Sequence, residues 1–183
     1  MADDIRAQRE AELLVVRCQL GERDAFDELI DAWQAPLWQY ARRVTASDDD
    51  ARDVTQDVWL RVVRGIGKLR DGARLRPWLF GIARRVLMDR FRALYAAPPA
   101  SDIDIGEIPA DAGNADLETD LQSMHVGLAR LPLVEREVLT LFYLQAQSMA
   151  ETADVLGIPV GTVKSRLFRA RQLLRRELQR EGE

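Results

Sequence analysis

Cysteine and histidine are almost absent from this chain of 183 residues, which contains one of each, Cys18 and His125. A single cysteine excludes an internal disulfide and any metal site built from several thiolates. A single histidine argues equally against a site with several imidazole ligands and against a Ser-His-Asp triad. Cys18 lies in the apolar stretch 13–20, so we expect a buried structural thiol rather than a redox sensor. We therefore expect no metal site and no cofactor.

Long apolar runs are also missing, and no stretch approaches the length that spans a membrane. The first residues lack the basic, apolar and cleavage-site regions of a secretory signal, so we expect a cytoplasmic protein without membrane insertion. Hydrophobic residues still make up 47% of the chain, which suffices for ordinary cores in one or two domains. Alternation of apolar and polar residues is scarce, and glycine and proline separate helical patterns. The predicted fold class is therefore all-α.

Basic charge is not in excess, since the net charge is −4, but it is strongly segregated. Between Lys68 and Arg92 eight cations stand against two acids, whereas from Ala96 to Asp120 there are seven acids and no cation. The local potential, rather than the net charge, decides where a polyanion binds. The distribution predicts two basic surfaces on either side of an acidic segment.

The acidic segment predicts the domain organisation. Residues 96–118 are rich in proline, glycine and acids and have little apolar periodicity, which is typical of an extended, mobile linker. The alternative is an ordered Ω-loop that covers a domain face. Two small helical domains are expected on either side, at residues 1–95 and 119–183.

Near the C-terminus the sequence predicts two helices joined by a tight turn. Ser148 followed by Glu151 is a capping-box pattern that begins a helix, and Gly157 ends it. Pro159 then starts a second helix, which has six cations and no acid as far as Arg176. A small core between the two helices is expected from Ala153, Leu156, Ile158, Val163 and Leu167.

The opposite face of that second helix is polar and basic, with Lys164, Ser165, Phe168 and Arg169. A helix of this kind fits the major groove of DNA, where long donors reach phosphates and base edges. The alternative is a cationic surface helix packed beside an acidic neighbour. Because turn, cap and basic face agree, we favour nucleic-acid binding.

In the first domain helices are expected at about 13–20, 24–45, 48–66 and 77–94, with a basic loop from Gly67 to Arg76.

The third of these helices, at 48–66, has a stripe of apolar core residues on one side and a polar face on the other. A solvated amphipathic helix would have the same pattern, but one apolar residue lies among the polar ones, as in an interface. The residues of this face are Asp53, Gln56, Asp57 and Leu60.

Three stretches of the chain resemble the bacterial RNA polymerase sigma factors of the extracytoplasmic-function (ECF) group. They are residues 50–60, residues 76–85 with Asp89 and Arg90, and residues 157–171. They occur in the family's order, and the likeness covers almost the whole chain, including the linker. It departs from the commoner pattern at Arg52, where an acid is usual, and at Arg85, where many relatives have a small polar residue.

The resemblance implies that the first domain is sigma region two, which binds core RNA polymerase and melts the minus-ten element of the promoter. Asp53, Gln56, Asp57 and Leu60 match the polymerase-binding face. The basic loop matches the segment that captures an unstacked base, and the fourth helix matches the promoter-reading face. The DNA-binding residues implied here are Lys68, Arg70, Arg74, Arg76, Arg84, Arg85, Met88, Asp89 and Arg92.

The second domain resembles sigma region four, which recognises the minus-thirty-five element as duplex DNA. Its implied contacts are Lys164, Ser165, Arg166, Phe168 and Arg169. The linker resembles the connector that enters the RNA channel of the polymerase. The family further implies regulation by an anti-sigma factor, to which exposed Leu60 and the basic faces are candidate contacts.

Two other classes of protein were weighed against a sigma factor without catalytic activity. A regulator with an N-terminal sensor domain would need no second DNA surface, so the basic segment 68–92 argues against it. An enzyme acting on nucleic acid would need a carboxylate cluster for a metal or a nucleophile with its base. The aspartates here lie at helix starts and in the linker, which argues against that class.

Overall fold

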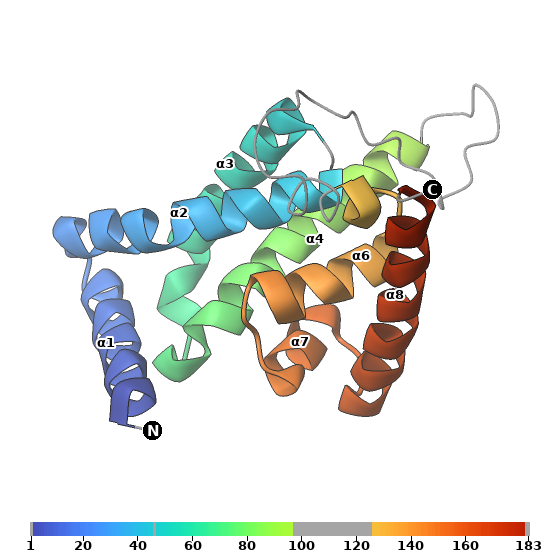
Figure 1. The fold of residues 1–183 in the computed structure, drawn as a ribbon. Helices are drawn as coiled ribbons and strands as arrows, with labels where there is room; N and C mark the ends of the chain where they lie inside the picture. Colours follow the sequence, from blue (N-terminus) through green and yellow to red (C-terminus); the bar gives the residue numbers. More distant parts are fainter. Residues whose placement is uncertain (1, 46, 97–125, 182–183) are drawn as a thin grey trace.

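The computed structural model describes residues 2–45, 47–96 and 126–181, and the regular structure in these ranges is helical throughout. The predicted all-α class is confirmed. Figure 1 shows helices α2 to α4 crossing one another, with α6 to α8 along one side of them and α1 at the far end. Residues 97–118 of the expected acidic linker lie outside the described residues. None of the described helices combines the length and the apolar character needed to cross a bilayer.

The N-terminal half consists of α1 (Ala2–Gln19), α2 (Arg23–Thr45), α3 (Asp48–Gly65) and α4 (Leu75–Ala96). The predicted helix at 13–20 was wrong in length, because α1 begins near the N-terminus. Its first turns are polar and give no apolar period, and pairs such as Arg6 with Glu10, 2.9 Å apart, support them. Gly21 ends α1 with a φ of 83°, a conformation that glycine adopts without strain.

The core of this half forms where α2, α3 and α4 cross. Tyr40 and Phe80 are almost fully buried and meet edge to face, with ring centroids 5.5 Å apart. The expected stripe of α3 is confirmed, because each of its members is at most 3% exposed. Its residues are Val54, Val58, Val62 and Ile66.

The basic loop between α3 and α4 is ordered by two short 3₁₀ turns, η1 (Ile66–Lys68) and η2 (Gly72–Arg74). Asp71 caps the second turn by accepting a hydrogen bond from the Ala73 amide at 3.0 Å. From α1, the Gln19 amide donates to the Ile66 and Leu69 carbonyls at 2.9 and 2.8 Å. The loop is therefore held in one position beside the N-terminus of α4.

The C-terminal half contains α6 (Leu133–Leu139), the π-helical segment η3 (Thr140–Leu144), α7 (Met149–Leu156) and α8 (Val160–Glu181). The predicted helix-turn-helix is confirmed by α7 and α8. The capping box is present, with Ser148 and Glu151 each accepting from the other's backbone amide. Of the five expected core residues, Ile158 is half-buried and the other four are buried.

The two halves lie in direct contact. Helix α7 packs against α4, and α6 and η3 pack against α2. Figure 1 shows α6 and α7 beside α4, with α8 on the outer side. The basic loop and α4 of the first half therefore face the second half.

Two glycines of the helix-turn-helix provide a matched test of the turn. Gly157 has a φ of 66°, whereas Gly161 lies within α8, and a Cβ at either position would meet open space. We expect Gly157→Ala to lower the free energy of unfolding by about 1–2 kcal/mol, because alanine is strained in the left-handed region. Gly161→Ala should instead raise it by roughly 0.5–1 kcal/mol, because alanine loses less backbone entropy in a helix. Denaturant titrations of both variants would check this, and equal effects would contradict it.

Candidate nucleic-acid and protein interfaces

The outward face of α3 combines acids with an apolar hollow. Asp53, Gln56 and Asp57 are exposed, and Leu60 is 49% exposed. Asp53 is held by Arg90 of α4 at 3.2 Å, and the same guanidinium bonds Asp50 at 2.5 Å. Next to the acids lies an open hollow, and its lining is mostly apolar. Its residues are Ile30, Gln56, Trp59, Leu60, Val63 and Arg64.

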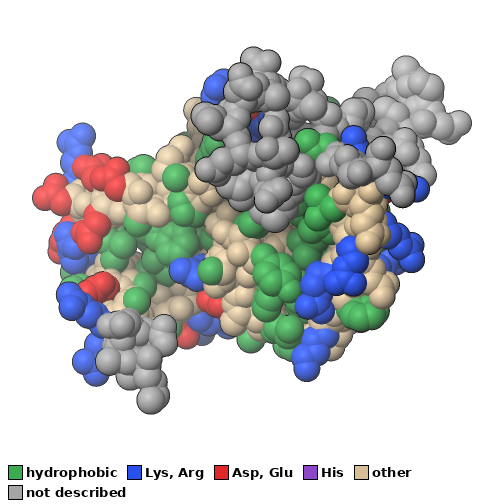
Figure 2. Space-filling model, viewed as in Figure 1, with side chains coloured by type: hydrophobic (Ala, Val, Ile, Leu, Met, Phe, Trp, Pro, Cys, Tyr) green, Lys and Arg blue, Asp and Glu red, His purple; other side chains and the backbone are tan. Residues whose placement is uncertain are grey.

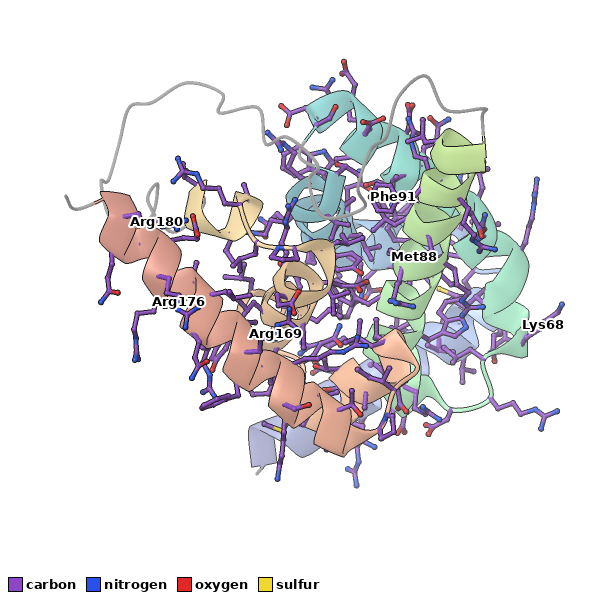
Figure 3. All side chains as sticks on the ribbon, turned by 90° about the vertical axis from the view of Figure 1, so that its right-hand side faces the viewer. Lys68, Met88, Phe91, Arg169, Arg176 and Arg180 are labelled. Atoms are coloured by element: carbon purple, nitrogen blue, oxygen red, sulfur yellow. The ribbon has the colours of Figure 1, made fainter. Side chains whose placement is uncertain are left out.

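The basic loop and the start of α4 enclose a second hollow, of about 380 Å³. Pro77 and Trp78 form an apolar wall, and Lys68, Arg70 and Arg74 provide cations around it. Figure 3 shows Lys68 extending away from the molecule at the edge of this loop. An apolar wall beside exposed cations suits an unstacked base with its phosphate. The remaining lining residues are Leu69, Asp71, Gly81, Arg85 and, from the second half, Asp154.

Farther along α4, some of the residues predicted to bind DNA are exposed, whereas Arg84 is half-buried against the second half of the molecule. Arg85 and Arg92 are exposed, and Asp89 is paired with Arg92 at 2.5 Å and with Arg61 of α3 at 2.9 Å. Met88 is half-buried, and Figure 3 shows it on α4 together with Phe91. Arg84 differs, because it is half-buried and faces the second half of the molecule.

Helix α8 presents the basic face that the sequence predicts. Lys164, Ser165, Phe168 and Arg169 are exposed, and Phe168 is 59% exposed although Leu167 beside it is buried. Figure 2 shows Lys and Arg side chains gathered over α8 at the right of the view, and Figure 3 shows Arg169, Arg176 and Arg180 along the same helix. Arg166 is half-buried instead.

Three consecutive charged residues of α6 are buried, which the sequence patterns described above do not predict. Glu135, Arg136 and Glu137 are at most 4% exposed, and together they make up three of the 7 residues of α6. Glu135 pairs with Arg169 of the recognition helix at 3.2 Å. A signal was present in the sequence, namely a short charged run inside an apolar segment. It does not say which groups pair with the charges, because the partners lie far away in the chain.

Glu137 joins the two halves of the molecule. Its Oε1 accepts hydrogen bonds from the Tyr40 hydroxyl at 2.8 Å and from Nε of Arg84 at 2.9 Å. Burial raises the pKa of Glu137, an effect that the charges of Arg84 and Arg166 and the two hydrogen bonds only partly offset. Burial, together with the neighbouring carboxylate, also raises the pKa of Tyr40 well above its usual value. The Tyr40 hydroxyl therefore stays protonated and donates.

Among the residues that the structure describes, three further hydrogen-bonded or ionic contacts join the halves. Arg74 pairs with Asp154 of α7 at 2.5 Å, and Arg76 donates to the Ala146 carbonyl at 3.2 Å. Arg136 donates to the Arg43 carbonyl near the end of α2 at 3.4 Å, where a cation also complements the helix dipole. The Arg74 pair is more than half exposed, so it adds at most about 1 kcal/mol. Of the polar contacts between the halves, the pair of Glu137 with Arg84 has the more deeply buried carboxylate.

Comparison with known proteins identifies the family. Residues 29–95 match the family described as Sigma-70 region 2, and residues 121–174 match Sigma-70, region 4. The two matches include α3, the basic loop, α4 and the helix-turn-helix, which are the elements that present the surfaces described above. The chain therefore belongs to the sigma-70 family of RNA polymerase sigma factors.

Individual relatives define the group within this family. The chain is 37% identical to the ECF RNA polymerase sigma factor SigM of Mycobacterium tuberculosis over 92% of its length and 84% of that protein. It is 30% identical to the RNA polymerase sigma-H factor of Pseudomonas aeruginosa, covering 94% and 95% of the two chains. The resemblance to the ECF group is thereby confirmed.

Two solved structures share the fold over most of the chain. The structure of CnrH in complex with the cytosolic domain of CnrY matches with a TM-score of 0.69 and 26% identity, covering 91% of this chain and 96% of that chain. The sigma factor RpoE of Bartonella quintana, in complex with the anti-sigma factor NepR, matches with a TM-score of 0.67 and 26% identity, covering 84% and 96%.

Two tyrosines test the weight of the buried contact. Tyr40→Phe removes a donor from a buried carboxylate, so we expect the free energy of unfolding to fall by about 1–3 kcal/mol. The matched control is Tyr143→Phe, because Tyr143 is about half exposed and its hydroxyl accepts a hydrogen bond from Arg171 at 3.3 Å. This control should stay within about 0.5 kcal/mol of the original chain. Denaturant unfolding measures both, and similar losses would mean that the Tyr40 hydroxyl has no special role.

Proposed function

We propose that this chain is a promoter-specificity subunit that binds core RNA polymerase, recognises a two-part promoter and promotes strand opening. It has no catalytic activity of its own and acts in the cytoplasm. The observation that supports this most is the presence of three different surfaces on separate helices. An acidic and apolar face, a cationic hollow and a basic recognition helix correspond to the three tasks of such a subunit.

The polymerase-binding surface in this proposal is the outward face of α3. Gln56 and Asp57 project into solvent, and Leu60 borders the apolar hollow beside them. Acids provide complementarity to a basic partner, and an apolar hollow accepts an anchoring side chain. Asp53 contributes charge at the edge of this face, although part of it is neutralised by Arg90.

The minus-ten surface consists of the basic loop and the exposed side of α4. An unstacked base would enter the hollow beside Trp78, and its phosphates would meet the loop cations. Arg85 and Arg92 continue this cationic line along α4. Melted DNA requires cations for the backbone and apolar surface for the bases, and both are adjacent here.

The upstream surface is α8. Lys164 and Arg169 are long donors, Ser165 is a short one, and Phe168 offers apolar contact to a base or sugar. Arg166 is half-buried, so we assign it to backbone contact or to support of the helix rather than to base recognition. In this proposal α8 binds the promoter as duplex DNA, because the major groove of the duplex is wide enough for an intact α-helix.

The same chain would be regulated by an anti-sigma factor. One structural relative was solved with an anti-sigma factor and another with the cytosolic domain of a second protein. On this chain the apolar hollow of α3 and exposed Leu60 provide a surface for which an inhibitor and the polymerase would compete.

The decisive experiment is transcription in vitro with core polymerase and a promoter library. The chain should direct initiation from a defined two-part promoter. Asp53→Ala, Gln56→Ala and Asp57→Ala together should reduce core binding in a pull-down while the circular-dichroism spectrum stays unchanged. The proposal is wrong if initiation occurs only when the polymerase already contains another sigma factor.

Two arginines of α8 separate base recognition from backbone affinity. Arg169 lies in the part of α8 that fits the groove, whereas Arg175 lies beyond it, and both are exposed. Arg169→Ala should change the preferred upstream element by roughly 1–3 kcal/mol of discrimination at one position. Arg175→Ala should weaken all sequences evenly and flatten the salt dependence. Binding to single-base variants at several salt concentrations would check this, and a uniform loss for both would place Arg169 outside the groove.

A further inference from the structure

Arg169 of the recognition helix combines an exposed guanidinium with a buried anchor. Its Nε lies 3.2 Å from Oε1 of Glu135, and the side chains of Arg169 and Glu135 are 71% and 6% exposed. Helix α6, which contains Glu135, packs against α8, and Figure 3 shows Arg169 midway along α8. Among the described residues, Arg169 is the one ion-pair partner of Glu135. A carboxylate from the interior therefore holds one end of a guanidinium that otherwise faces solvent.

The position of Arg169 on α8 explains how an exposed side chain reaches a buried one. At 100° per residue, Arg169 lies between Ser165, which is exposed, and Arg166, which is half-buried. Leu167 and Ala170 are buried and mark the side of α8 that faces the core. Arg169 is thus at the edge of the exposed face, where its Nε can contact α6 while the rest of the guanidinium stays in solvent.

The nitrogen atom that makes this contact matters for DNA binding. A guanidinium has five N–H groups in a fixed plane, and the pair with Glu135 uses the Nε end. The two terminal nitrogens of Arg169 can still form a bidentate contact with O6 and N7 of a guanine in the major groove. Arg171 differs, because its Nη1 donates to the Tyr143 hydroxyl at 3.3 Å. The contact with Glu135 therefore orients the base-binding end of Arg169 without occupying it.

We propose that Glu135 is a positioning residue for base recognition by Arg169. The carboxylate holds the guanidinium in the orientation that a base edge requires, so DNA binding does not have to order a free side chain. The inference rests on the proposed function, because it takes α8 as the helix that enters the groove. Glu135 is buried and does not itself contact DNA. It affects specificity only through Arg169.

Positioning of this kind changes the discrimination between bases rather than the affinity for all sequences. Immobilising one long side chain on binding weakens a complex roughly two- to tenfold. In the unmodified chain the pair with Glu135 has already ordered Arg169 before DNA binds. On an unfavoured base Arg169 forms no bidentate contact, so no ordering is required. Loss of the pair should therefore weaken binding to the preferred element and leave binding to the others unchanged.

The test compares two glutamates that each pair with an arginine of α8 at 3.2 Å. Glu135→Gln breaks the pair with Arg169. Glu177→Gln breaks the pair with Arg180, which lies beyond the part of α8 that fits the groove. Both variants lose one negative charge, so the control accounts for a general increase in attraction to DNA.

Each variant is reconstituted as the full chain with core RNA polymerase. The holoenzyme is offered competing promoters in which every position of the upstream element is varied singly. Relative initiation rates then give the discrimination at each position. The position read by Arg169 is the one at which Arg169→Ala abolishes discrimination.

Glu135→Gln should reduce discrimination about two- to tenfold at the position read by Arg169 and leave the other positions unchanged. Glu177→Gln should leave every position unchanged. In the Arg169→Ala background, Glu135→Gln should have no further effect on discrimination, because the group that it positions is gone. Unchanged discrimination, an equal loss at all positions, or an additive loss in the double variant would each overturn the proposal.

A substitution at a buried site can also disturb the fold, so denaturant unfolding of each variant is measured in parallel. If Glu135→Gln loses cooperative unfolding, Glu135→Met takes its place, because it puts an apolar side chain of similar size at the buried position, and the same result is expected. Initiation by the unmodified chain without a change at any single position in the variants rejects this inference alone. If the unmodified chain does not initiate with core polymerase, the proposed function is rejected, and the inference with it.

Discussion

The carboxylate of Glu137 lies where α2, α4 and α6 meet, and the packing of the two halves of this molecule depends on its pairing. A buried charge without partners is strongly unfavourable, so the Tyr40 hydroxyl and the Arg84 guanidinium must stay within reach of it. That requirement sets where α6 lies relative to α2 and α4. The position of α6 in turn determines where α7 and α8 lie, since both pack against it or follow it in the chain.

The guanidinium groups of this protein's arginines can bind either protein oxygen atoms or DNA phosphates. A guanidinium forms similar charge-assisted hydrogen bonds with a carboxylate, a backbone carbonyl and a phosphate. Arg74 and Arg84, which the family resemblance implies for DNA, therefore find protein partners when no DNA is present. The α3 face and the exposed side of α8 have no such competitor from the opposite half among the described contacts.

Local signals in the sequence were sufficient for most of the fold. The capping box at Ser148, the turn at Gly157 and the apolar stripe of α3 each involve neighbours within one or two helical turns, and all three are present. The length of α1 was missed because its first turns are stabilised by polar pairs rather than by an apolar face. The polar face of α3 and the basic face of α8 were also placed correctly on the outside, because helical periodicity alone assigns the two sides.

The sequence by itself determined the helices, their caps, the segregation of charge and the membership of the sigma-70 family. Only the tertiary structure decided which charges are free. Glu137 meets its partners 97 and 53 residues away in the chain, and Asp154 meets Arg74 across 80 residues. No local period or spacing encodes contacts at such separations, because they form only when helices from distant parts of the chain pack together. The surface cations predicted from the sequence were thereby divided into those that face solvent and those that hold the two domains together.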